Sequence, residues 1–227
     1  MTKGKMTVIT SPFLAFVLSI AMLACSTASS SVPAANTAAV PETTVVAKGT
    51  QTAVFAGGCF WGVEAVFEHV RGVTDARSGY AGGTLKNPDY DSVSEANTGH
   101  AESVKVTFDP EKVSYAQLLQ VFFSVVHDPT QLNYQGPDHG TQYRSAIFYT
   151  SDDQMKAAKE YVDSLSKANT FPKPIVTEIS QLKEFYEAEA YHQDYLRKNP
   201  NEPYIVVNDQ PKVAALKKQF PDLYVEK

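Results

Sequence analysis

Apolar residues recur along the chain with two different periods, and these periods predict a series of short strands and amphipathic helices. Alternating or continuous apolar runs predict strands at 52–56, 73–78, 103–108, 146–149 and 175–179. A period of 3.6 residues predicts helices at about 60–70, 115–126, 152–167 and 212–219. Ser114 and Ser151 immediately precede the second and third helices, where serine is a favoured N-cap.

The spacing of these elements indicates the class of fold. Strands and helices interleave, but no helical repeat separates the strand at 73–78 from the strand at 103–108. These two strands therefore have no helical crossover between them, which argues against a wholly parallel sheet. We predict an α+β domain, a two-layer sandwich of helices on a mixed or antiparallel sheet.

Two long segments without a clear period interrupt this pattern, at 79–99 and 127–143. Segments of this length are unusual as simple connections and are often functional. We therefore look for binding and catalytic side chains in both.

The first 25 residues have the outline of an export signal. Lys3 and Lys5 precede an apolar run at 8–23, and the sequence Met-Leu-Ala-Cys-Ser at 22–26 resembles a bacterial lipoprotein cleavage box. The match is imperfect, since Met22 and Leu23 stand where such boxes carry a leucine and a small residue. We predict a signal peptide at 1–25 with lipidation of Cys25, and a location in the periplasm or cell envelope. Ordinary signal cleavage and an uncleaved membrane anchor remain as alternatives.

Residues 26–50 are rich in Ser, Thr, Ala, Val and Pro and show no periodicity, which is typical of a flexible linker. The remaining 177 positions, 51–227, carry all of the predicted strands and helices. We predict that 51–227 form one catalytic domain.

Composition excludes several classes of function. A net charge of -5 and a pI of about 5.5 argue against a nucleic-acid partner, which would require a basic face. The two cysteines, Cys25 and Cys59, are too few for a disulfide framework or a cysteine-based zinc cluster. The five histidines are scattered and form no HExxH motif. We expect no metal and no other cofactor.

Cys59 is the strongest candidate for a reactive side chain. It lies where the strand at 52–56 passes into the helix that begins at Phe60, after Gly57 and Gly58, which allow a sharp bend. Unpaired backbone N–H groups and the positive end of the helix dipole favour a thiolate at such a turn. We therefore predict that Cys59 is a nucleophile, although an inert buried cysteine remains the alternative.

Five short motifs in the folded part of the chain share a family likeness. Together they resemble the A-type peptide methionine sulfoxide reductases, over residues 52–200. The motifs are Gly57-Gly58-Cys59-Phe60-Trp61-Gly62, Gly79-Tyr80-Ala81-Gly82-Gly83, Thr98-Gly99-His100-Ala101-Glu102, Asp138-His139-Gly140-Thr141-Gln142-Tyr143-Arg144-Ser145 and Tyr191-His192-Gln193. The resemblance implies a ferredoxin-like fold and the reduction of methionine S-sulfoxide, free or in peptides and proteins, as a repair activity for oxidised envelope proteins.

The resemblance also implies a chemical role for four residues. The thiolate of Cys59 would attack the sulfoxide sulfur, and Glu102 would donate a proton to the oxygen, which requires a raised pKa. Tyr90 and Tyr143 would donate hydrogen bonds to the same oxygen. The products would be methionine and a sulfenic acid on Cys59. Taken singly, Glu102 could be a solvated charge and the two tyrosines could be rim or core residues.

Four further residues are implied in substrate binding. Phe60 and Trp61 would hold the S-methyl group through apolar and sulfur–aromatic contact, and Gly58 and Asp138 would line the pocket. Trp61 could instead fill the core, and Asp138 could cap its loop.

The absence of any cysteine after Cys59 departs from many relatives, which carry further cysteines near the C-terminus. We therefore expect a monomeric one-cysteine enzyme whose sulfenic acid is reduced by thioredoxin or another external thiol. A disulfide between Cys25 and Cys59 remains the alternative. Three other functions also remain open: a thiol peroxidase, a Cys-nucleophile acyl transferase using a histidine base, and a peptide-binding lipoprotein without enzymatic activity.

Overall fold

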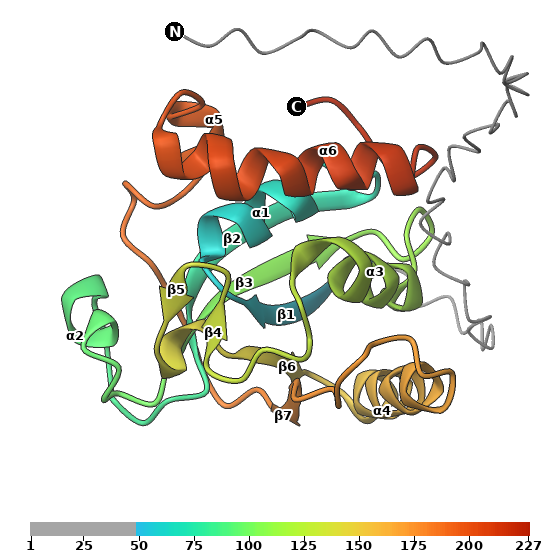
Figure 1. Cartoon of the computed structure of the whole chain (residues 1–227), viewed down its shortest axis with the longest axis horizontal. Helices are drawn as coiled ribbons and strands as arrows, with labels where there is room; N and C mark the ends of the chain where they lie inside the picture. The colour runs from blue at the N-terminus through green and yellow to red at the C-terminus, as the bar shows by residue number, and fades with distance from the viewer. Residues whose placement is uncertain (1–48) are drawn as a thin grey trace, which may run out of the picture. The chain divides into compact units, whose positions relative to one another are not determined.

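The computed structural model describes residues 49–227 of the chain. The predicted signal peptide, Cys25 and all but the last two residues of the predicted linker lie outside this range. The described residues form a mixed six-stranded sheet in the order β7-β6-β1-β3-β2-β8 (Figure 1). These strands are β1 (Gln51–Gly57), β2 (Val73–Ala81), β3 (Ala101–Phe108), β6 (Ser145–Tyr149), β7 (Glu178–Gln181) and β8 (Phe185–Glu187). Only β6 and β7 pair in parallel, so the predicted mixed sheet is confirmed.

The central part of the sheet is a ferredoxin-like unit. Its elements run β1, α1 (Phe60–Glu68), β2, β3, α3 (Tyr115–Val121) and β6 along the chain, and its four strands lie in the order β6-β1-β3-β2. All three pairs within it are antiparallel. This βαββαβ arrangement confirms the α+β class and the ferredoxin-like fold.

The two faces of the sheet are covered very differently. In β1, Ala53 and Phe55 face the main core, where they pack with side chains from α1, α3, α4 (Asp152–Lys167) and α6 (Gln210–Gln219). Val54 and Ala56 face the opposite side, a small cluster covered by Leu182 and Phe185. Side chains alternate along β1, so the helices pack on one face of the sheet and only a small apolar cluster lies on the other. The domain therefore has two layers.

The helix predicted at 115–126 changes geometry partway. It is α-helical over Tyr115–Val121 and continues as the π-helical turn η1 (Phe122–Val126). Phe122, Phe123 and Val126 are all buried in the core. A π turn widens the helix by one residue, so this apolar-rich stretch can bury side chains that a regular 3.6-residue repeat would turn outward.

One predicted strand begins later than expected. The strand predicted at 175–179 is β7, which starts at Glu178 and pairs in parallel with β6, Ala146 lying opposite Glu178. The alternation at 175–177 does not reflect sheet pairing, since the N–H of Val176 donates to the carbonyl of Pro129 instead (2.8 Å).

The two segments without a period contain short elements that periodicity did not predict. The first holds α2 (Tyr90–Ser94), whose N-terminus is capped by a capping box between Asp89 and Ser92. The second holds the hairpin of β4 (Tyr134–Gln135) and β5 (Asp138–His139) and the 3₁₀ turn η2 (Thr141–Tyr143). Later in the chain, α5 (Tyr195–Lys198) and the π-helical η3 (Ile205–Asp209), which leads directly into α6, were also unpredicted. All of these are too short to show a hydrophobic repeat.

Within residues 49–227, the helices are too short or too polar for any of them to cross a membrane.

Candidate active site

The turn between β1 and α1 places Cys59 at the N-cap of α1. Gly58 precedes it with a φ of 91°, and a Cβ at Gly58 would lie 2.6 Å from the Cβ of Gln135. Only glycine tolerates both this positive φ and the close approach of Gln135, so the turn before Cys59 requires a glycine at position 58. Cys59 is 7% exposed, and its side chain makes no capping hydrogen bond to the first turn of α1.

The protonation state of Cys59 differs from the sequence-based prediction. Burial raises the pKa of the Cys59 thiol well above its usual value, and the negative charges of Glu102 and Asp209 raise it further. The Trp61 N–H and the Lys212 ammonium lower this pKa but do not outweigh burial. The predicted resting thiolate is therefore wrong for the free protein, because the site at this helix terminus is dry and negatively charged.

Glu102 lies beside the same turn. On β3 it faces the same side of the sheet as the core residues Val104 and Val106, and it is 3% exposed. Its Oε2 accepts a hydrogen bond from the N–H of Phe60 (3.0 Å). Burial, and to a lesser extent the charge of Asp138, raises the pKa of Glu102 to about 8. Glu102 is therefore no solvated charge but a buried carboxylic acid that holds its proton at neutral pH.

Tyr90 and Tyr143 come from the two segments without a period and meet at this acid. Tyr90 begins α2 and is held by a hydrogen bond from its N–H to Glu189 Oε1 (2.8 Å), while Tyr143 ends η2. Burial first, and the charge of Glu102 second, raises the pKa of both phenols. Both therefore stay protonated and can donate hydrogen bonds next to Glu102.

Aromatic rings form the wall beside Cys59. Phe60 is fully buried, with its ring centroid 4.9 Å from that of His192. Trp61 is only partly buried and stacks on Tyr195, with centroids 3.7 Å apart and planes 6° from parallel. Its Nε1–H donates to His192 Nδ1 (3.1 Å), which fixes the histidine as the tautomer that carries its proton on Nε2. Burial also lowers the pKa of His192, so this ring is neutral.

Asp138 lies on the other side of the site. It belongs to β5 and accepts a hydrogen bond from the hydroxyl of Tyr204, whose ring meets Trp61 edge to face at 5.9 Å. Asp138 therefore links the 127–143 segment to the C-terminal part of the chain. Its charge also contributes to the raised pKa of Glu102.

The structure thus places six of the predicted site residues near Cys59, and Gly58 shapes the turn before it. Cys25, the predicted lipidation site, lies outside the described residues. Sequence reasoning missed three residues from the C-terminal part of the chain, namely Tyr204, Asp209 and Lys212. Asp209 and Lys212 form an ion pair (3.1 Å), and Asp209 is fully buried. Their polar and basic surroundings in the sequence are typical of an exposed helix start, so no local signal marks them as buried.

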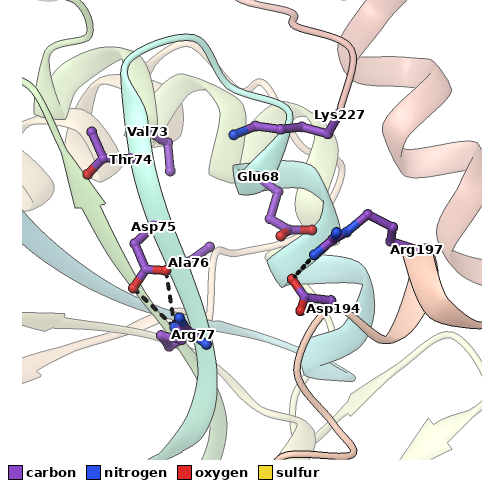
Figure 2. A pocket seen from close by; sticks show the side chains of 9 residues that line it. All are labelled: Glu68, Val73, Thr74, Asp75, Ala76, Arg77, Asp194, Arg197 and Lys227. Carbon is purple, nitrogen blue, oxygen red and sulfur yellow. Dashed lines mark hydrogen bonds and ion pairs between the residues drawn. The ribbon is translucent and has the colours of Figure 1, made fainter.

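A cavity of about 220 Å³ lies where α1 ends and β2 begins, and none of the predicted site residues lines it (Figure 2). Figure 2 shows the Asp194 carboxylate paired with Arg197, at 2.6 Å. The N–H of Asp194 donates to Glu64 Oε2 (2.9 Å). These contacts fix the chain between His192 and Tyr195, so the charged groups here support the aromatic wall from behind.

Within the described range, no group of three or more His, Cys, Asp or Glu side chains is arranged to hold a metal ion. The reactive groups that the site contains are a buried thiol, a carboxylic acid and two phenols.

Comparison with known proteins identifies a family with this site. The family model described as "Peptide methionine sulfoxide reductase" matches residues 51–224. The peptide methionine sulfoxide reductase MsrA 2 of Mesorhizobium japonicum is 61% identical over 181 residues, covering 80% of this chain and 93% of that protein. The protein of the same name from Synechocystis sp. is 52% identical over 176 residues, covering 78% of this chain and 82% of that protein.

Solved structures agree with these relatives. Methionine sulfoxide reductase A of Corynebacterium diphtheriae has a TM-score of 0.61 and 38% identity, covering 69% of this chain and 78% of that chain. Mxr1 from Saccharomyces cerevisiae in reduced form has a TM-score of 0.60 and 36% identity, covering 67% of this chain and 87% of that chain.

Proposed function

The chain belongs to the peptide methionine sulfoxide reductase family and reduces methionine sulfoxide, and we propose that Cys59 is the nucleophile and Glu102 the proton donor of this reaction. The observation that carries the assignment is the buried pair itself. A thiol stands at the N-terminus of α1, and a carboxylic acid with a pKa of about 8 is bonded to the N–H of the next residue, Phe60. A sulfoxide sulfur becomes a good electrophile only when its oxygen is protonated, so both groups are needed.

In the proposed reaction the Cys59 sulfur attacks the sulfoxide sulfur while Glu102 gives its proton to the oxygen. Tyr90 and Tyr143 donate hydrogen bonds to that oxygen as it gains charge. The proton of the thiol replaces the one that Glu102 gave up. The sulfur–oxygen bond of the substrate then breaks and the oxygen leaves as water. A water molecule next attacks the Cys59 sulfur and breaks the new sulfur–sulfur bond, which leaves methionine as a thioether and Cys59 as a sulfenic acid, so that Cys59 supplies the two electrons.

We assign the binding of the substrate methyl group to the aromatic wall. Trp61 is partly exposed and is held rigidly between Tyr195 and the hydrogen bond to His192, while Phe60 closes the wall from inside. A rigid aromatic surface favours an apolar methyl group and contacts sulfur well. This surface suits methionine S-sulfoxide both as a free amino acid and within a peptide.

The second half of the cycle requires an external reductant. Residues 60–227 contain no cysteine, so none of them can form a disulfide with Cys59. In our proposal one thiol attacks the sulfenic acid and releases water, and a second thiol breaks the mixed disulfide and restores Cys59. A dithiol protein such as thioredoxin supplies both thiols from one molecule.

We further propose that the enzyme is exported and attached to a membrane of the cell envelope through a lipid on Cys25. The support is the basic start, the apolar run at 8–23 and the cleavage box at 22–26. Incorporation of a labelled fatty acid into the full chain, compared with a Cys25→Ser variant, tests this point. Equal labelling of both would exclude Cys25 as the attachment site.

A pair of cysteine variants of the full chain tests the proposed cycle. With a dithiol reductant and methionine S-sulfoxide, we expect the Cys25→Ser variant to turn over like the unchanged protein and the Cys59→Ser variant to release no methionine. Loss of turnover in Cys25→Ser would show that a Cys25–Cys59 disulfide is required and would contradict the one-cysteine cycle.

The alternative chemistries gain no support from the site. An acyl transferase needs a histidine base next to the thiol. Here His192 accepts a hydrogen bond from Trp61 through Nδ1, and His127 is half-buried with its Nδ1 against the carbonyl of Phe122 (3.0 Å).

A further inference from the structure

Asp209 is a buried carboxylate that the reaction described above does not use. It ends η3 at the point where the chain enters α6, and its side chain is fully buried. Figure 1 shows α6 lying along α1. Asp209 itself lies against Gly62, in the first turn of the helix that Cys59 caps.

The contact between Asp209 and α1 depends on a glycine. A Cβ at Gly62 would overlap Asp209 Oδ1 and lie 2.7 Å from its Cγ. Gly62 comes three residues after Cys59, so the absence of a side chain there lets the carboxylate approach the N-terminal turn closely.

The two oxygens of Asp209 have different environments. Oδ1 is paired with Lys212 Nζ (3.1 Å), whose side chain is 24% exposed and so can reach solvent. Oδ2 is buried and has no hydrogen-bond partner within the described residues. An unpaired carboxylate oxygen in a dry place is costly, and in native structures such groups concentrate where they have a function.

The charge of Asp209 reaches both reacting groups. It raises the pKa of the Cys59 thiol and that of Glu102, while Lys212 acts on Cys59 in the opposite direction. The other titratable groups that face Cys59 come from β3, α2, η2 and the chain before η3; they are Glu102, Tyr90, Tyr143 and Tyr204. The three phenols are neutral at pH 7, so the charges around this pair are those of Asp209, Lys212 and, at Glu102, Asp138. Burial raises the pKa of Asp209 itself, and Lys212 acts to lower it.

We propose that Asp209, held by Lys212, is a positioning residue that keeps Cys59 and Glu102 protonated until a sulfoxide enters the site. This inference rests on the proposed function, because keeping Glu102 protonated matters only if Glu102 is the proton donor. A resting thiol also reacts far more slowly with peroxides than a thiolate does, so the same charge protects Cys59 between turnovers.

The test measures the rate of alkylation of Cys59 by iodoacetamide between pH 6 and 10, followed on the Cys59 peptide by mass spectrometry in the full chain. Asp209→Asn removes the negative charge with little change in shape. We expect its pH profile to move to lower pH and its rate at pH 7 to rise about three- to tenfold. Lys212→Gln removes the positive charge, and we expect its profile to move to higher pH.

Opposite shifts in the two variants are the signature of a charge effect, since a loss of packing would move both in the same direction. Lys156 and Glu160 form an exposed pair on α4, so Glu160→Gln serves as the matched control and should leave the profile unchanged. Unshifted profiles, or shifts of the same sign in both variants, would overturn the proposal.

Alkylation needs no sulfoxide, so its outcome is independent of the reductase chemistry. Opposite shifts without any release of methionine from the unchanged protein would uphold the role of Asp209 and reject the proposed function. A normal release of methionine with unshifted profiles would do the reverse.

Discussion

Glu102 illustrates how burial turns an ordinary residue into a reagent. In sequence it is one of many acids and lies just before the strand predicted at 103–108, so only the family motif at 98–102 points to it. In the structure it is enclosed and accepts a hydrogen bond from the N–H of Phe60. Its pKa of about 8 follows mainly from the loss of water. The same loss of water keeps Cys59 as a thiol, although its position at a helix N-terminus predicted a thiolate.

The proton on Glu102 gives a prediction for the rate of methionine release in a single turnover. Because Glu102 must be protonated to act as an acid, the rate should fall as the pH rises through about 8. Glu102→Gln cannot donate a proton, so its rate should be lower by a factor of about 10² or more. Its rate should also not fall as the pH rises through this range. A rate in Glu102→Gln close to that of the unchanged protein would remove Glu102 from the reaction. Glu160→Gln, on the exposed face of α4, is the control.

At the scale of elements, the site combines long regular elements of the domain with short elements from the segments between them. The end of β1 and the start of α1 supply Cys59, and these two elements were predicted because their hydrophobic periods are strong and local. β3 supplies Glu102, which lies just before the strand predicted at 103–108 and was identified only through a family motif. The remaining parts come from α2, η2 and η3, which are too short for any period and are fixed by contacts over a long distance in sequence. Tyr204, for example, bonds to Asp138, 66 residues earlier. Sequence patterns do not report such partners, and only the family motifs pointed to Tyr90 and Tyr143.

The close contact of α6 with α1 predicts a strong effect at Gly62. Gly62→Ala would place a Cβ on top of Asp209 Oδ1, so α6 must move. We expect the free energy of unfolding to fall by about 1–3 kcal/mol, measured by denaturant titration. Removing the obstacle should relieve part of this loss, so the double variant Gly62→Ala, Asp209→Ala should be less destabilised than the sum of the two single variants. Additive losses would show that the two residues do not meet.

At the scale of the whole molecule, the domain holds several protons that its unfolded chain would release. Glu64 is 1% exposed and Glu68 lies one turn later on α1; burial raises their pKa values to about 8 and about 7. A carboxyl group whose pKa is raised on folding stabilises the folded state only while it is protonated. Between the usual value of 4.5 and these raised values, the folded state binds more protons than the unfolded one. Stability should therefore decrease as the pH rises over this range.

Glu64→Gln tests this pH dependence directly. The amide oxygen can still accept the N–H of Asp194, but the side chain no longer ionises. We expect the variant to have nearly the same melting temperature as the unchanged protein at pH 5 and a higher one at pH 9. If the melting temperatures of the two proteins differed by the same amount at every pH in this range, Glu64 would not hold its proton on folding. Glu160→Gln should leave the pH dependence as it is.

The central claim is that one cysteine carries out the reduction, and a single turnover without reductant tests it most directly. Fully reduced protein would be mixed with excess methionine S-sulfoxide, and the methionine released would be counted against the thiols that remain. We predict about one methionine per chain, together with the loss of the Cys59 thiol and a sulfenic acid that can be trapped on Cys59. No methionine with Cys59 still reduced would contradict the account, and a disulfide between Cys59 and Cys25 in the product would contradict its one-cysteine cycle.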